Sequence, residues 1–213
     1  MPYDPSLSVT EQVHASIKSS LHNLRPTKDT TSVSDSYIDT LVIHSPLRTI
    51  DMTLEVWQAL ETYVPHQIRN LGISNCSLPI LAELNASSAT KVKPAVVQNR
   101  FYEDTDFDVP LRKFCRENDI IYQSFWTLTA NPRLVRSKPV QQLANQAKIS
   151  PAAALYTLVI SLGNTTVLNG TKNEERMRED LAAPQEVQKF TRANSAAWQE
   201  LMAGFRQLIG DSA

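Results

Sequence analysis

Short apolar segments typical of β-strands alternate with helical segments five times along the chain, and this alternation constrains the fold more than any other feature. The apolar residues run together without a strict polar alternation, as expected of strands that are covered on both faces. Repeats of this kind build βαβ units and a parallel sheet, either doubly wound or part of a barrel. The predicted strands are Tyr37–His44, Asn70–Ser74, Pro94–Asn99, Ile120–Ser124 and Thr166–Asn169. We therefore predict an α/β fold in which residues 1–213 form a single domain.

Several helix starts are marked by residues that cap helix ends. Ser8 and Glu11 have the spacing of a capping box, and Ser150 before a proline is typical of a first helical turn. Asp108 is predicted to cap another helix. The polar segment Arg25–Ser36 has neither helical nor strand periodicity, so we expect a loop. Further helices are predicted near Met52–Tyr63, Ser77–Ser88, Val109–Asn118, Val140–Ala147, 173–181 and Gln185–Leu208.

Composition and charge exclude several classes of protein. The 213 residues are 42% hydrophobic, and a net charge of −1 offers no broad basic surface for nucleic acid or an anionic membrane. No run reaches the ~18 apolar residues of a membrane span, and "MPYDPSLSVTEQ" does not have the pattern of a signal peptide. The sequence also contains no GxGxxG motif, no Walker-type phosphate loop and no metal-ligand spacing. We expect a cytoplasmic protein with a small-molecule substrate and no nucleic acid, membrane or metal partner.

Each predicted strand is followed at once by polar or aromatic residues. The pairs are His44-Ser45, Ser74-Asn75, Gln98-Asn99, Ser124-Phe125 and Asn169-Gly170. In a parallel α/β barrel the active site lies at the carboxyl ends of the strands, where such residues would meet. Because each of the five strands is followed by a polar or aromatic residue at the same end of the sheet, we predict a functional site there. For His44 taken alone, a structural histidine bonded to a backbone carbonyl is the alternative interpretation.

Five segments resemble, in order and spacing, motifs of the aldo-keto reductases. They read "YIDTLVIHSP", "LGISN", "KPAVVQNRFY", "SPAAALYTLVI" and "TVLNGTKNEERMRED", and the resemblance covers nearly the whole chain from "YDPSLSVTEQV" onward. The resemblance implies a (β/α)₈ barrel, of the TIM type, that binds a nicotinamide cofactor across its carboxyl-terminal mouth. It also implies an oxidoreductase that acts on the carbonyl group of a small organic substrate, which we expect to be a specialised metabolite.

The resemblance assigns roles to particular residues. His44 matches the family's active-site histidine, which orients the carbonyl. Phe125 falls where the family usually stacks a tyrosine on the nicotinamide ring, and it retains the stacking face. The residues that match the contacts to the nicotinamide carboxamide are Ser74, Asn75 and Gln98. Those that match the adenosine-binding end are Arg176, Glu179 and Asp180. Amide contacts and an aromatic wall make sense chemically, because hydride transfer requires a clamped ring.

Two departures concern the cofactor. Gly170 stands where the family usually has a lysine that pairs with the 2′-phosphate of NADPH. Trp126 stands where the family often has a serine near the pyrophosphate. The cofactor is therefore expected to be either NADP or NAD.

The resemblance begins late in the family pattern. Three strands and two helices precede the stretch that resembles "YDPSLS" in the family, and they carry the catalytic tyrosine, its lysine partner and an aspartate. We therefore expect an incomplete barrel that keeps only His44 of these four residues. Its two open sheet edges would favour a homodimer that covers them. The other interpretation is that Met1 is an internal start and the full chain is longer.

Three functions are open at this point. The first is an NAD(P)-dependent oxidoreductase of aldo-keto reductase type, with His44 or water as the proton donor. The second is a cofactor-independent dehydratase, isomerase or cyclase in which His44 serves as acid and base. The third is a non-catalytic remnant.

Overall fold

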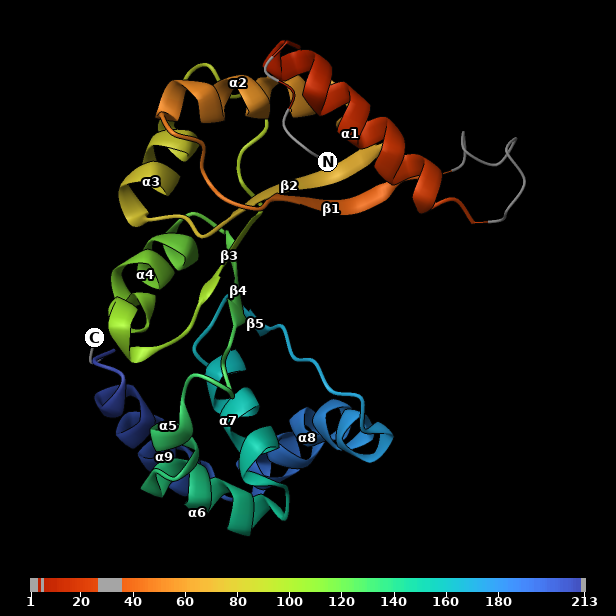
Figure 1. The fold of residues 1–213 in the computed structure, drawn as a ribbon. Coiled ribbons are helices and arrows are strands. Elements are labelled where there is room, and N and C mark those ends of the chain that lie inside the picture. Colours follow the sequence, from red (N-terminus) through yellow and green to blue (C-terminus); the bar gives the residue numbers. More distant parts are fainter. Residues whose placement is uncertain (1–3, 5, 27–35, 212–213) are drawn as a thin grey trace. The chain divides into compact units, whose positions relative to one another are not determined.

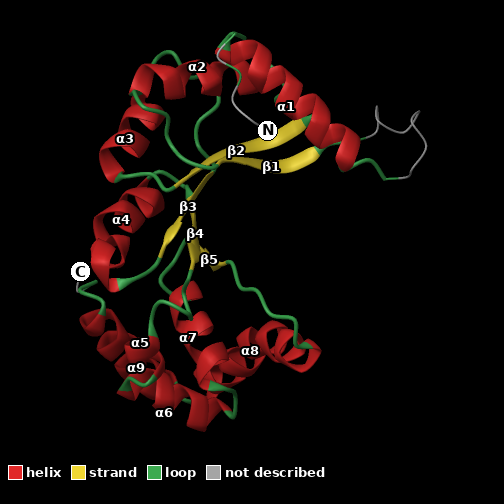
Figure 2. Ribbon diagram, in the orientation of Figure 1, coloured by secondary structure: helices red, strands yellow, loops and turns green. Residues whose placement is uncertain are grey.

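The structure of the chain is a computed structural model that describes residues 4, 6–26 and 36–211 (Figures 1 and 2). The strands are β1 (Ile38–Ile43), β2 (Ile68–Ser74), β3 (Val96–Arg100), β4 (Ile121–Phe125) and β5 (Thr165–Val167). The helices are α1 (Val9–Asn23), α2 (Ile50–Glu61), α3 (Leu78–Ala86), the 3₁₀ helix η2 (Glu103–Asp108), α4 (Val109–Glu117), α5 (Pro132–Val135), α6 (Lys138–Ala147), α7 (Pro151–Ile160), α8 (Glu174–Ala193) and α9 (Ser195–Leu208). Residues 27–35, most of the predicted loop Arg25–Ser36, lie outside the described residues.

The strands form a parallel sheet in the order β1-β2-β3-β4-β5. The predicted α/β class with a parallel sheet is thereby confirmed, whereas the incomplete eight-stranded barrel stays a prediction. Strand β3 contains the boundary between two compact units of the chain. Unit 1 is Met1–Gln98 and unit 2 is Asn99–Ala213.

Unit 1 is built around the pairing of β1 with β2 and the helices that follow each strand. The register pairs Ile38 with Ile68 at one end and Ile43 with Ile73 at the other. Helices α1 and α2 pack against each other (Figure 1). From α2, the fully buried Trp57 donates its indole N–H to the carbonyl of Val92 at 2.8 Å. The capping box predicted for α1 is confirmed by reciprocal hydrogen bonds between its two members.

Strands β2 and β3 approach so closely that only glycine fits at position 72. A Cβ atom added to Gly72 would lie 2.7 Å from the carbonyl oxygen of Val96 and 3.0 Å from its Cβ. Gly72 and Val96 are partners in the parallel register, and this contact lies where the β2–β3 pairing begins. Because the nearer atom belongs to the backbone, a side chain at this position would push the strands apart.

Unit 2 is centred on the apolar helix α7, which contacts α5, α6, α8 and β5. Its predicted cap is confirmed, since the Ser150 hydroxyl accepts a hydrogen bond from the N–H of Ala153 at 3.2 Å. The prediction of a separate helix over Gln185–Leu208 was wrong. Helix α8 continues through Pro184 to Ala193, and the break comes before α9. Ala183 and Val187 are both buried on one face of α8, so packing holds the helix across the proline.

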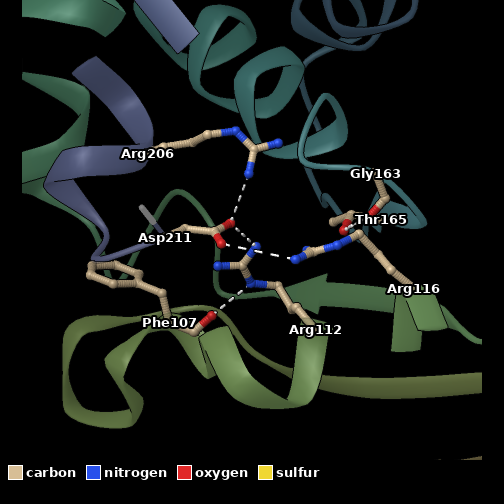
Figure 3. A network of polar contacts seen from close by, with 7 residues as sticks. All are labelled: Phe107, Arg112, Arg116, Gly163, Thr165, Arg206 and Asp211. Carbon is tan, nitrogen blue, oxygen red and sulfur yellow. Dashed lines mark hydrogen bonds and ion pairs between the residues drawn. The ribbon is translucent and has the colours of Figure 1, made fainter. Parts of the chain in front are cut away.

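A buried carboxylate joins the end of unit 2 to helix α4 (Figure 3). Asp211 Oδ2 lies 2.9 Å from Arg112 Nη1 on α4 and 3.3 Å from Arg206 Nη1 on α9, and Asp211 Oδ1 lies 4.0 Å from Arg116 Nη2. The side chain of Arg112 is 0% exposed and that of Asp211 is 2% exposed. Arg112 Nε donates a further hydrogen bond to the carbonyl of Phe107 at 2.8 Å.

The predicted cap at Asp108 was wrong. Asp108 occupies the N-cap position of α4, but its backbone is left-handed (φ 51°) and its side chain makes no capping hydrogen bond. The Oδ2 atom instead accepts hydrogen bonds from Asn99 Nδ2 and Tyr122 Oη, each at 3.0 Å. Asp106 and Phe107 are also left-handed, and this run turns the carboxylate away from the helix and towards the strands. A capping residue normally has extended backbone, which explains the failure of the pattern.

Candidate functional site

In unit 1, the predicted site residues tie the carboxyl ends of β1 and β2 to Gln98 of β3. Ser74 is buried at 2% exposure and is paired in register with Gln98. Its hydroxyl donates a hydrogen bond to the carbonyl of Gln98 at 2.7 Å. Hydrogen bonding of this kind satisfies a buried polar group and fixes the position of the next residue, Asn75.

Asn75 connects the end of β1 to Gln98 of β3. Its backbone N–H donates to the carbonyl of Gln98 at 3.0 Å, and its Nδ2 donates to the carbonyl of His44 at 2.7 Å. The backbone is left-handed (φ 51°), a conformation that asparagine tolerates better than most residues. The structure therefore brings His44, Ser74, Asn75 and Gln98 to one edge of unit 1. His44 is exposed, and the hydrogen bond from Asn75 goes to its backbone rather than to its imidazole.

In unit 2, Phe125 ends β4 beside a second aromatic residue and an arginine. The rings of Phe125 and Trp126 meet edge to face, with centroids 6.2 Å apart. The guanidinium of Arg100 lies 4.5 Å from the Trp126 centroid and 5.9 Å from that of Phe125. Trp126 is 51% exposed. Together the three side chains present an apolar face and a positive charge at the carboxyl end of β4.

A cavity of about 470 Å³ in unit 2 contains all three residues predicted for the adenosine end. This volume is in the range of small-molecule sites. Phe125 does not line it. The cavity is formed by the segment after β4, the first two turns of α7, the segment after β5 and the first turns of α8. Its lining residues are Leu128, Thr129, Ser150, Pro151, Ala152, Tyr156, Gly170, Thr171, Arg176, Glu179 and Asp180.

Hydrogen bonds to the two carboxylates hold the wall of this cavity. Glu179 Oε1 accepts from the backbone N–H of Ser150 at 2.7 Å, which ties α8 to the start of α7. Asp180 Oδ2 accepts from Asn169 Nδ2 at 2.8 Å, which ties α8 to the segment after β5. Asn173 caps α8 by accepting from the N–H of Arg176 at 3.0 Å. The carboxylates are thus fixed in place while each keeps capacity to accept further hydrogen bonds.

Tyr156 is a cavity residue that the sequence reasoning missed. It lies four residues after Ala152 on α7, so the two residues share a helix face, and this spacing could have identified it. Burial raises the pKa of Tyr156, and the charge of Asp180 raises it further. The phenol therefore stays protonated at neutral pH and can donate a hydrogen bond.

Within residues 4, 6–26 and 36–211, no group of three or more histidine, cysteine, aspartate or glutamate side chains is placed to hold a metal ion. The helices of this part of the chain include none that is long and apolar enough to span a membrane.

Comparison with known proteins identifies the relatives of the chain. An uncharacterized oxidoreductase of Schizosaccharomyces pombe is 31% identical over 166 residues, which are 78% of this chain and 54% of the relative. An aldo/keto reductase from Brucella melitensis superposes with a TM-score of 0.64 at 20% identity, over 86% of this chain and 68% of that one. A Gox0644 mutant in complex with NADPH superposes with a TM-score of 0.58 at 21% identity, over 76% and 60%.

These matches cover the chain more fully than they cover its relatives. The chain spans about half the length of the curated relatives that it matches. The structural likenesses, at this level of identity, establish the fold alone. The family model described as "Aldo/keto reductase family" matches residues 5–203, nearly the whole sequence. The chain therefore belongs to the aldo/keto reductase family.

Proposed function

We propose that this chain is an NAD(P)-dependent oxidoreductase that reduces the carbonyl group of a small organic molecule. The family supplies the reaction class. The proposal of a nicotinamide cofactor rests on the cavity of about 470 Å³ in unit 2, because the three residues predicted for the adenosine end all line it. A relative of similar fold has been solved with NADPH, which agrees with this choice of cofactor class.

The residues of this cavity fit the adenosine end of a dinucleotide by their chemistry. Carboxylates such as Glu179 and Asp180 accept hydrogen bonds from ribose hydroxyls. The guanidinium of Arg176 can pair with a phosphate or stack on a base. Two helices, α7 and α8, begin at the cavity wall, and their N-terminal dipoles favour an anion.

In unit 1 the edge residues would position the nicotinamide and deliver a proton. Reduction needs a hydride at the carbonyl carbon, which a bound reduced nicotinamide supplies, and a proton at the carbonyl oxygen. Asn75 and Gln98 are proposed to hold the carboxamide, with Ser74 fixing Asn75. The side chain of His44, which is exposed at the same edge, is proposed to donate the proton to the oxygen and yield the alcohol.

The test measures oxidation of reduced nicotinamide, and loss of the carbonyl substrate, when the full chain is mixed with a panel of small aldehydes and ketones. His44→Ala should lower kcat by about 10²–10⁴-fold, the usual contribution of a positioned acid. The control is His66→Ala, because His66 is also exposed but precedes β2 rather than following a strand. Equal activity of the two variants would contradict the role of His44. Turnover without any nicotinamide would instead support the cofactor-independent alternative.

A further inference from the structure

Three arginine side chains of unit 2 approach the single carboxylate of Asp211, and we call Arg112, Arg116 and Arg206 the arginine cluster (Figure 3). Arg112 Nη1 lies 2.9 Å and Arg206 Nη1 lies 3.3 Å from Asp211 Oδ2, so both donate hydrogen bonds to it. Arg116 Nη2 lies 4.0 Å from Asp211 Oδ1, which is too far for a hydrogen bond. One negative charge therefore lies where three positive charges meet.

The arginine cluster keeps a surplus of positive charge. A second carboxylate, that of Asp108, also acts electrostatically on Arg112. Its Oδ2 atom accepts hydrogen bonds from Asn99 and Tyr122 rather than from an arginine. Even when both carboxylates are ionised, the three guanidinium groups outnumber them, so these groups together carry a net positive charge in a largely buried place.

Two nitrogen atoms of the arginine cluster are buried and have no hydrogen-bond partner among the described residues. They are Arg112 Nη2 and Arg116 Nη1. The side chain of Arg112 is 0% exposed, so its remaining N–H groups cannot bond to bulk water. Buried polar groups in folded proteins are nearly always hydrogen-bonded, and an exception indicates an acceptor such as a bound water molecule or ion. A water molecule would satisfy the hydrogen bonds alone, whereas an anion would also neutralise the charge.

The arginine cluster reaches the protein surface through two of its members. The side chain of Arg116 is 27% exposed and that of Arg206 is 32% exposed, so an anion from solvent has access to both. These guanidinium groups come from different helices, α4 and α9. An anion with acceptor oxygens on several sides is therefore suited to contact both. Phosphate has this shape, and arginine binds phosphate oxygens in pairs.

We propose that the arginine cluster binds a phosphate group, either as the free ion or on a small phosphate monoester, and thereby joins α4 to α9. The site is distinct from the unit 2 cavity, because none of the three arginines lines that cavity. The inference does not depend on the proposed function.

The test is calorimetric titration of the full chain with inorganic phosphate at constant ionic strength. We expect saturable binding that Arg116→Gln and Arg206→Gln each weaken at least ~10-fold, a difference of about 1.4 kcal/mol. Glycerol 3-phosphate is titrated in the same way, and the tighter of the two ligands shows whether the site takes the free ion or a monoester. Phosphate should also raise the melting temperature of the unchanged chain above its value in chloride of equal ionic strength, a shift that requires no variant.

The matched control is Arg192→Gln, which removes the same charge from an exposed position of α8 and should leave the affinity for phosphate unchanged. Arg176→Gln tests the competing site, because Arg176 lines the unit 2 cavity and could also pair with phosphate. Loss of binding in Arg176→Gln, with the affinity kept in Arg116→Gln and Arg206→Gln, would overturn the inference and leave the proposed function standing. Absence of saturable phosphate binding by the unchanged chain would overturn it too.

Discussion

Asp211 is a buried carboxylate that three arginine side chains approach. Its carboxylate is the shared partner of guanidinium groups on α4 and α9 and is 2% exposed. Burial lowers the pKa of Arg112, while the charge of Asp211 and its hydrogen bond act in the opposite direction. A buried guanidinium is tolerated only when a counter-charge is present, so the carboxylate of Asp211 allows Arg112 to be buried in unit 2.

Asp211→Ala should therefore lower the free energy of unfolding by about 3–5 kcal/mol, because it leaves Arg112 buried without its counter-charge. Urea denaturation measures the change. The control is Asp39→Asn, which removes an ion pair with Arg69 whose side chains are 68% and 56% exposed. That pair should contribute no more than ~1 kcal/mol. Similar losses in the two variants would contradict the assignment of a special role to the buried network.

Asp108 should give stability a pH dependence of a particular sign. Burial raises its pKa, and the hydrogen bonds from Asn99 and Tyr122 and the charge of Arg112 offset only part of this effect. The folded chain therefore holds the proton more tightly than the unfolded chain. The resulting stabilisation is fully present below the unfolded pKa of about 3.9, and it is lost as the pH rises through the folded pKa.

Asp108→Asn abolishes this titration while keeping an oxygen that can accept both hydrogen bonds. The free energy of unfolding of the variant, minus that of the unchanged chain, should rise as the pH is raised from the acid range to neutrality. Urea denaturation at a series of pH values measures the difference. Asp119→Asn serves as the control, since Asp119 shares the left-handed backbone and is exposed. A difference that falls with pH would have the wrong sign for a buried carboxyl.

At the scale of elements, Gly72 in β2 and Gly204 in α9 differ in how much room each has for a side chain. The contact of Gly72 with the backbone of Val96 sets the separation of β2 and β3. A Cβ atom added to Gly204 in α9 would lie 3.4 Å from Pro139 Cγ, which is an ordinary van der Waals contact. Gly72 is required because the two strands approach each other closely. Gly204 is not required by packing, and glycine inside a helix lowers the stability of that helix.

Replacing each glycine by alanine should therefore change stability in opposite directions. Gly72→Ala should lower the free energy of unfolding by about 1–3 kcal/mol, since the strands must separate to admit the methyl group. Gly204→Ala should raise it by about 0.5–1 kcal/mol through helix propensity. Thermal denaturation of the two variants beside the unchanged chain would reveal both effects. Stabilisation by Gly72→Ala would contradict the close approach of the strands.

The elements themselves were largely predictable, because apolar runs and capping residues act locally. Within unit 1 the grouping of His44, Ser74, Asn75 and Gln98 could also be predicted, since the carboxyl ends of neighbouring parallel strands lie at one edge.

What the sequence could not predict depended on distant packing. Separate helices were expected over 173–181 and Gln185–Leu208, but buried neighbours hold α8 as one helix through Pro184. Asp108 was expected to cap, and a left-handed run turned it away. Tyr156 joined the cavity only through the fold of unit 2.

At the scale of the whole molecule, the order of the strands decides which of them pair on one side only. In the part of the chain that the structure describes, β1 and β5 stand at the ends of the strand order. Edge strands with unpaired N–H and C=O groups are templates for pairing with another chain. The homodimer expected from the sequence stays a prediction. Sedimentation velocity should then show a sedimentation coefficient that rises with protein concentration, and a constant monomer value would contradict it.

The burial of Trp57 has a practical consequence for studying such a chain. It is the one tryptophan of unit 1, and its indole is shielded from water and bonded to a carbonyl. Shielded indoles emit at shorter wavelengths than wetted ones, so its signal should be separable from that of the half-exposed Trp126 in unit 2. Emission spectra recorded during denaturation could then report whether the two halves of the polypeptide lose their structure together or one after the other.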